Sequence, residues 1–131
     1  MPLDVHLVSP EQVLFEGPAD MVVCRPSDGE IAFLPGHEPF LGALGDHPVR
    51  ILLPGGGEVA AAVHGGFVEV SHNHVIILSD VAELPSEIDL DRAITAKARA
   101  EVVLRASPDD YDAAIALQRA ETRIEVAQAA G

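Results

Sequence analysis

The side chains best suited to chemistry are basic residues in the last third of the chain, spaced as on the faces of two helices. Asp89 and Arg92 are three residues apart, and Arg99 lies seven residues beyond Arg92, so on a helix they share one face. Arg119 and Arg123 are four residues apart and are neighbours on a following helix. In an antiparallel helix pair these guanidinium groups converge, and packed cations repel each other unless an anion lies among them. The spacing therefore indicates an anion site.

A carboxylate, Glu83, precedes these helices and lies close to the predicted site. The alternative interpretation is that the arginines are ordinary solvated residues on helix surfaces. In that case the Asp89–Arg92 pair is an exposed ion pair worth only about 0.5 kcal/mol. The residue types alone leave both interpretations open.

Other reactive side chains lack the neighbours that catalysis or metal binding requires. His72 and His74 form a His-x-His pair with His64 nearby, but no cysteine or acidic cluster completes a metal site. The Pro-Gly-Gly-Gly sequence at 54–57 is not followed by the Lys-Ser/Thr of a phosphate-binding loop. The serines have no nucleophile-elbow context. We therefore predict no catalytic residue and no metal site.

The first 86 residues are short apolar runs separated by glycine and proline about every ten residues. This pattern predicts a β-sandwich of about ten short strands, with turns at 45–48 and 65–66 among others. Hydrophobic residues make up 48% of the chain and aromatic residues only 4%, so the core should consist of Val, Ile, Leu and Ala.

The composition changes at Ser86, and from 88 to 130 the chain has no glycine and a single proline, Pro108. Ser86 is a candidate N-cap in a capping-box-like start, and a helix is predicted to run to about Ala106. A second helix is predicted from about Asp110 to Ala129, and the short break favours an antiparallel hairpin. The predicted fold class is therefore α+β, with a β-sandwich at 1–86 and a two-helix hairpin at 87–131.

Each predicted helix carries an apolar stripe. The stripes comprise Leu90, Ala93, Ile94 and Leu104 on the first helix and Ala113, Leu117, Ala120 and Ile124 on the second. A hairpin this small has little core of its own, so we expect it to dock reversibly on another surface.

The overall charge excludes some classes of partner. The formal net charge is -13, which disfavours nucleic acids and anionic lipid surfaces. No apolar run approaches the roughly 20 residues of a membrane span, and no signal peptide is visible. We therefore expect no nucleic-acid binding and no direct lipid insertion, and any membrane association should come through a partner.

Several segments carry recognisable motifs in a fixed order. They are residues 7–11 with 14–17, residues 28–40, residues 65–70, residues 75–80, and the Ile-Asp-Leu-Asp-Arg-Ala sequence at 88–93. In this order and spacing they resemble the epsilon subunits of bacterial F-type ATP synthases, over essentially the whole chain.

This resemblance implies a non-catalytic subunit of the rotor, peripheral to the cytoplasmic face of the bacterial plasma membrane. The sandwich is expected to lie beside the gamma subunit and on the c-ring, and to couple proton transport to ATP synthesis. The hairpin is expected to be regulatory: folded, it permits activity, and extended toward the alpha and beta subunits, it inhibits ATP hydrolysis. The alternative is a free-standing ATP-sensing adaptor protein, and a sandwich-fold hydrolase is a third, weaker possibility.

The resemblance also assigns candidate site residues. No cofactor is expected, and ATP is the expected regulatory ligand. The implied nucleotide-binding residues are Glu83, Ile88, Asp89, Arg92, Ala93, Arg99, Arg119 and Arg123. Glu30 and His37 are implied to lie on loops that touch the c-ring, the alternative being that they are solvated turn residues.

Overall fold

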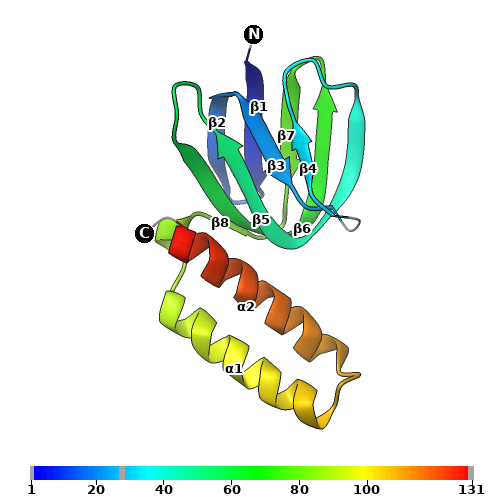
Figure 1. The fold of residues 1–131 in the computed structure, drawn as a ribbon, viewed down its shortest axis with the longest axis vertical. Coiled ribbons are helices and arrows are strands. Elements are labelled where there is room, and N and C mark those ends of the chain that lie inside the picture. Colours follow the sequence, from blue (N-terminus) through cyan, green and yellow to red (C-terminus); the bar gives the residue numbers. More distant parts are fainter. Residues whose placement is uncertain (1, 27–28, 130–131) are drawn as a thin grey trace.

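The computed structural model describes residues 2–26 and 29–129 and shows a β-sandwich with a helical hairpin packed against one end (Figure 1). The described residues form eight strands rather than about ten. The strands are β1 (Leu3–Ser9), β2 (Gln12–Ala19), β3 (Met21–Cys24), β4 (Ile31–Phe33), β5 (Phe40–Leu52), β6 (Glu58–Ser71), β7 (His74–Leu78) and β8 (Ala82–Glu83). The predicted fold class, a sandwich followed by a two-helix hairpin, is confirmed.

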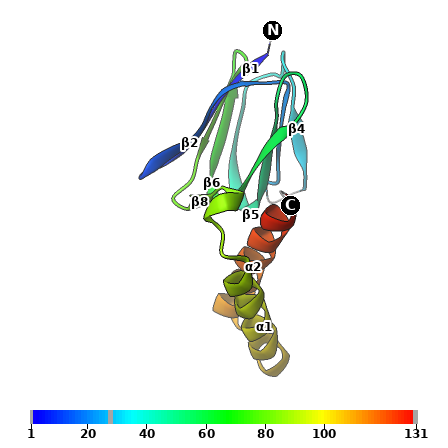
Figure 2. The same cartoon turned by 90° about the vertical axis from the view of Figure 1, so that its left-hand side faces the viewer.

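Two long strands run through both layers of the sandwich (Figure 2). β5 and β6 pair in antiparallel register from Phe40↔Val70 to Leu52↔Glu58. The second half of β6 pairs with β7 in the layer that continues to β1 and β2. The second half of β5 pairs with β3 in the layer that ends at β4. One continuous sheet in the order β2-β1-β7-β6-β5-β3-β4 therefore folds over into two layers. The short strand β8 pairs with β6 in antiparallel orientation.

The predicted turns at 45–48 and 65–66 are wrong, because both segments lie inside β5 and β6. Here the two strands bend at the hairpin end of the sandwich (Figure 1). Gly65 and Gly66 have φ values of 76° and 129°, which side chains with a Cβ rarely adopt. The hydroxyl of Ser79 lies 2.6 Å from the carbonyl oxygen of Gly65 and helps to hold the bend. Glycines that resemble turn signals thus allow the strands to bend without ending.

The core lies between the two layers and has the predicted composition. Its largest fully buried side chain is Phe33, and most of the others are aliphatic. They include Leu3, Val5, Leu7, Val22, Val49, Ile51, Val63, Val68, Val70, Val75 and Ile77.

The first helix begins later than the sequence predicts. Pro85–Glu87 forms a 3-10 turn, and α1 spans Leu90–Ala106. Its N-cap is Asp89, whose carboxylate accepts a hydrogen bond from the Arg92 backbone N–H at 3.1 Å. The predicted N-cap, Ser86, instead lies inside the 3-10 turn, and the backbone is extended at Ile88 before the helix starts.

The second helix, α2, spans Tyr111–Ala129, close to the predicted bounds. Asp110 caps it by accepting from the Ala113 backbone N–H at 2.9 Å. α2 lies between the sandwich and α1, so α1 packs mainly on α2 (Figures 1 and 2). No helix in the described ranges is both long and apolar enough to cross a membrane.

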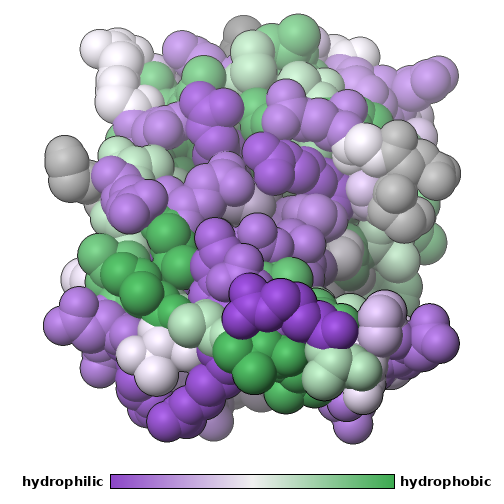
Figure 3. Space-filling model, turned by 60° about the horizontal axis from the view of Figure 1, so that its bottom comes forward, coloured by the Kyte–Doolittle hydropathy of each residue, from purple (hydrophilic) through white to green (hydrophobic). Residues whose placement is uncertain are grey.

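The contact between the helices is built from small side chains. Ala93 and Ala100 of α1 and Ala113 and Ala120 of α2 are buried. The predicted stripe on α1 is wrong at Ile94, which is 48% exposed, because the alanine row faces α2 instead. Figure 3 brings the hairpin end forward and shows hydrophobic patches separated by hydrophilic side chains.

Candidate functional site

A cavity of about 260 Å³ lies where the end of the sandwich, the start of α1 and the middle of α2 meet. Its lining residues are Glu83, Glu87, Asp89, Arg92, Ala93, Ala96 and Arg123. Five of the eight predicted nucleotide-site residues are therefore brought together, from three separate parts of the chain.

The cavity combines two guanidinium groups with carboxylates that are already hydrogen-bonded. Arg123 Nε donates to Glu83 Oε1 at 2.7 Å. Glu87 accepts from the Leu84 backbone N–H at 2.9 Å and from Gln12 Nε2 at 3.1 Å. These two hydrogen bonds, chiefly the one from Leu84, lower the pKa of Glu87. Guanidinium groups suit phosphate oxygens, and carboxylates accept from hydroxyl or amino groups, so the lining fits a ligand with both.

Three predicted site residues do not line this cavity. Ile88 immediately precedes the N-cap and is half-buried, and Arg99 is exposed two turns along α1 from Arg92. Arg119 points to the sandwich, where its Nε lies 3.5 Å from Asp46 Oδ1. Of the four arginines predicted to converge, the structure places Arg92 and Arg123 at the cavity. The nucleotide-binding role of all eight residues remains a prediction.

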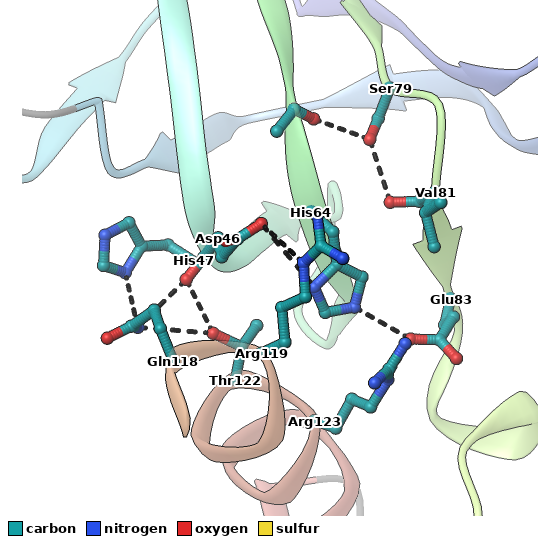
Figure 4. A network of polar contacts seen from close by, with 11 residues as sticks. Asp46, His47, His64, Ser79, Val81, Glu83, Gln118, Arg119, Thr122 and Arg123 are labelled. Carbon is teal, nitrogen blue, oxygen red and sulfur yellow. Dashed lines mark hydrogen bonds and ion pairs between the residues drawn. The ribbon is translucent and has the colours of Figure 1, made fainter. Parts of the chain in front are cut away.

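A polar network that the sequence analysis did not find joins α2 to the sandwich beside this cavity (Figure 4). Thr122 Oγ1 donates to the Asp46 backbone oxygen at 2.7 Å, and Gln118 Nε2 donates to the same oxygen at 3.0 Å. Arg119 pairs with the Asp46 carboxylate, and Arg123 pairs with Glu83. We call these residues, together with His64, the docking network. The one sequence signal for the docking network is the helical spacing of residues 118, 119, 122 and 123. The residues that they contact lie on bent strands and in β8, and have no such signal.

His64 lies at the centre of the docking network. Its side chain is completely buried, and its Nε2 lies 2.9 Å from Glu83 Oε1. Its Nδ1 lies 3.9 Å from Asp46 Oδ1 and has no hydrogen-bond partner among the described residues. Burial is the largest cause that lowers the pKa of this imidazole, and the nearby Arg123 lowers it further.

The two residues predicted to contact the c-ring lie at opposite ends of β4. Glu30 Oε2 lies 3.5 Å from Arg25 Nε. The same arginine also reaches α2, because its Nη2 lies 3.4 Å from Glu125 Oε2. Glu30 is therefore at the hairpin end of the sandwich. The ring of His37 packs against Phe33 near the β6–β7 turn, at the other end of the sandwich. The structure does not bring Glu30 and His37 together, and their contact with a c-ring remains a prediction.

Neither a metal nor a reactive thiol is indicated. In the part of the chain that the structure describes, no three His, Cys, Asp or Glu side chains are arranged to hold a metal ion. The single cysteine, Cys24, is buried, and burial raises the pKa of its thiol to about 12.

An apolar row crosses the outer face of the layer formed by β2, β1, β7, β6 and β5. Strand register places Val13, Val8, Leu78, Phe67 and Ala43 side by side in that order. Val13, Leu78 and Phe67 are 56%, 53% and 58% exposed. We call these five residues the outer row. An exposed apolar row across five strands is typical of a contact surface.

Comparison with known proteins gives matches over both parts of the chain. The family "ATP synthase, Delta/Epsilon chain, beta-sandwich domain" matches residues 2–85, and "ATP synthase, Delta/Epsilon chain, long alpha-helix domain" matches residues 86–128. The ATP synthase epsilon chain of Brevibacillus brevis is 46% identical over 99 residues, covering 76% of this chain and 75% of the relative. The ATP synthase epsilon chain of Streptomyces griseus is 41% identical over 122 residues, covering 93% and 92%.

A solved structure gives the same result in three dimensions. A chain of the Euglena gracilis mitochondrial ATP synthase, in a structure of its OSCP, F1 and c-ring, superposes with a TM-score of 0.83 at 25% identity. The superposition covers 97% of this chain and 81% of that one. The membership predicted from the motifs is confirmed: the chain belongs to the ATP synthase delta/epsilon family, and its relatives are bacterial epsilon chains.

Proposed function

We propose that this chain is a regulatory subunit of the central stalk of a bacterial F-type ATP synthase. In this role it turns with the rotor, helps to couple proton transport through the c-ring to ATP synthesis, and catalyses no reaction itself. It would lie peripherally at the cytoplasmic face of the plasma membrane, held there by its partners. The observation that carries the proposal is the family match over both the sandwich and the hairpin.

The outer row is the proposed contact with the gamma subunit. It is apolar, and it crosses five strands of the sandwich. A hollow of about 300 Å³ between Val8, Phe67 and Leu78 adds a recess for a side chain of the partner. A stable interface should bury more than about 1,200 Å² in total.

Phe67→Ala should weaken binding of the isolated full chain to a gamma subunit by roughly tenfold, since buried aromatic anchors commonly contribute more than about 1 kcal/mol. Titration of each variant over immobilised gamma subunit would measure the dissociation constants. Ile94→Ala is the matched control, because Ile94 is similarly exposed but lies on α1. Equal affinities of the two variants would contradict the assignment of the outer row, and absence of any gamma binding would favour the adaptor function.

The hairpin is the proposed regulatory element. Its contact with the sandwich depends on α2, on small apolar side chains and on the polar docking network, whereas α1 lies outside. Contacts of this kind separate more readily than a continuous apolar core. We propose that the released hairpin extends along the gamma subunit toward the alpha and beta subunits and there inhibits ATP hydrolysis.

ATP is the proposed ligand of the cavity lined by Glu83, Arg92 and Arg123. A ligand that contacts both helices and the end of β8 would bind the docked hairpin and not the extended one. It would therefore shift the population toward the docked form. At a hundred times its dissociation constant it would favour that form by about 2.7 kcal/mol. High ATP would thus hold the hairpin docked, and low ATP would free it to inhibit.

Ending the chain after Glu87 should remove inhibition and leave assembly intact, because the strands end at Glu83 and the core lies within them. ATP hydrolysis by the assembled synthase should become faster at low ATP, whereas the rates at high ATP should converge with those of the full-length form. Steady-state hydrolysis across ATP concentrations would measure this. An unchanged profile would show that the hairpin does not inhibit.

A further inference from the structure

His64 is placed so that its protonation state and the position of the hairpin must affect each other. It lies in β6 at the bend, between Asp46 of β5 and Glu83 of β8, and α2 covers it (Figure 4). Because the Glu83 carboxylate only accepts hydrogen bonds, His64 Nε2 must carry the proton in their 2.9 Å contact. The neutral ring therefore presents a bare Nδ1, buried and without a donor, toward Asp46.

With a neutral imidazole, the charges around His64 balance. The groups that face it are the carboxylates of Asp46 and Glu83 from the sandwich and the guanidinium groups of Arg119 and Arg123 from α2. His47 of β5 lies beyond them and contacts Gln118 at 3.4 Å. A proton on His64 would add a buried positive charge directly beneath the two arginines, and the docked arrangement would then carry one cation too many.

Release of the hairpin removes the causes that lower the pKa of His64. Burial and Arg123 lower the pKa of His64, whereas Glu83 and Asp46 raise it. The two carboxylates belong to the sandwich and stay beside His64 when the hairpin leaves, but the covering helix and its arginines go. We therefore expect the pKa of His64 to be higher in the released form than in the docked form.

The sign of the pH dependence follows from this difference. The released form binds the proton more tightly, so docking is strongest above the His64 pKa of the released form. Docking weakens as the pH falls from there to the lower pKa of the docked form, below which it changes no further. We propose that His64 is the sensor of a proton-dependent latch, in which proton uptake by its imidazole releases the helical hairpin from the sandwich.

The latch can be tested in the isolated full chain by energy transfer between dyes on Asp20→Cys and Ser107→Cys. Both positions are exposed, on the sandwich and on the tip of the hairpin, and buried Cys24 should stay unlabelled. Between pH 8 and pH 5.5 the docked fraction should fall, and the docking equilibrium should weaken up to about tenfold for each unit of difference between the two pKa values.

The decisive variant is His64→Gln, which keeps a donor for Glu83 but does not titrate in this range, so its docked fraction should not change with pH. His6→Gln is the matched control, since His6 lies on β1 beside Asp4 and outside the docking network, and it should keep the wild-type pH dependence. His47→Gln should keep it as well. A pH dependence that survives in His64→Gln, or one that disappears in His47→Gln, would overturn the proposal.

A second variant leaves His64 intact. Thr122→Val removes the 2.7 Å hydrogen bond to the Asp46 backbone and weakens docking by a route independent of the proton. The hairpin of Thr122→Val should therefore be released at a higher pH than the hairpin of the wild type. If the energy transfer stays constant from pH 8 to pH 5.5 in both the wild type and Thr122→Val, the latch does not exist.

Discussion

Gly66→Ala should destabilise the sandwich by about 2–6 kcal/mol, which combines backbone strain with overpacking. Gly66 has a φ of 129°, and a Cβ at this position would collide with the carbonyl oxygen of Leu78 and lie 2.9 Å from the Cα of Ser79. Both obstacles are backbone atoms of the neighbouring segment, so relief requires the bend itself to move. Urea denaturation followed by circular dichroism would measure the loss.

The matched control is Gly45→Ala in the partner strand β5, at the same bend. A Cβ there would meet only the side chain of His47, at 3.2 Å, and the backbone has no left-handed φ. Gly45→Ala should lower the free energy of unfolding by about 1 kcal/mol or less, because the half-buried side chain of His47 can shift. Similar costs for the two variants would show that the bend does not depend on Gly66.

Arg123→Ala should weaken ATP binding by roughly 10- to 150-fold, since a hydrogen bond to a charged group contributes about 1.5–3 kcal/mol. Arg123 both lines the cavity and pairs with Glu83 at 2.7 Å. Its loss would therefore remove a phosphate donor and leave the Glu83 carboxylate unneutralised beside the ligand. Calorimetric titration of the full chain with ATP would measure the change.

The control for general charge effects is Arg105→Ala, because Arg105 is exposed in the last turn of α1 and away from the cavity. The affinity of Arg105→Ala for ATP should equal that of the wild type. Arg99→Ala tests the extent of the site, since a tenfold loss would show that the ligand reaches beyond the cavity along α1. No heat from the wild type with millimolar ATP would contradict the nucleotide site altogether.

Local sequence signals predict the helices, the core and most of the cavity lining, because these depend on neighbours in the chain. The aliphatic core and the grouping of Asp89 with Arg92 follow from spacing along one element, whereas Ala93 joins the group through the family motif. Arg123 joins that group because the two helices are antiparallel, as their short connection predicts.

The features that could not be predicted depend on angles between elements. The glycines at 45, 65 and 66 have the composition of turns, and only the pairing of β5 with β6 shows that the strands continue through them. Arg119 is one turn from Arg123 but faces Asp46, because the rotation of α2 about its axis is set by its contact with the bend. The sequence does not predict the surroundings of His64, since its partners come from two other strands.

The two strands shared by both layers have a mechanical consequence. In many sandwiches the layers are held face to face by side-chain packing alone, so a sideways load is opposed only by contacts that can slip. Here β5 and β6 pass from one layer to the other while remaining hydrogen-bonded to each other. Sliding one layer past the other would therefore strain covalent backbone and break ladder hydrogen bonds together. If the chain turns with a rotor, as we propose, it would gain torsional stiffness in this way. The bend that provides the stiffness is also the surface on which α2 rests.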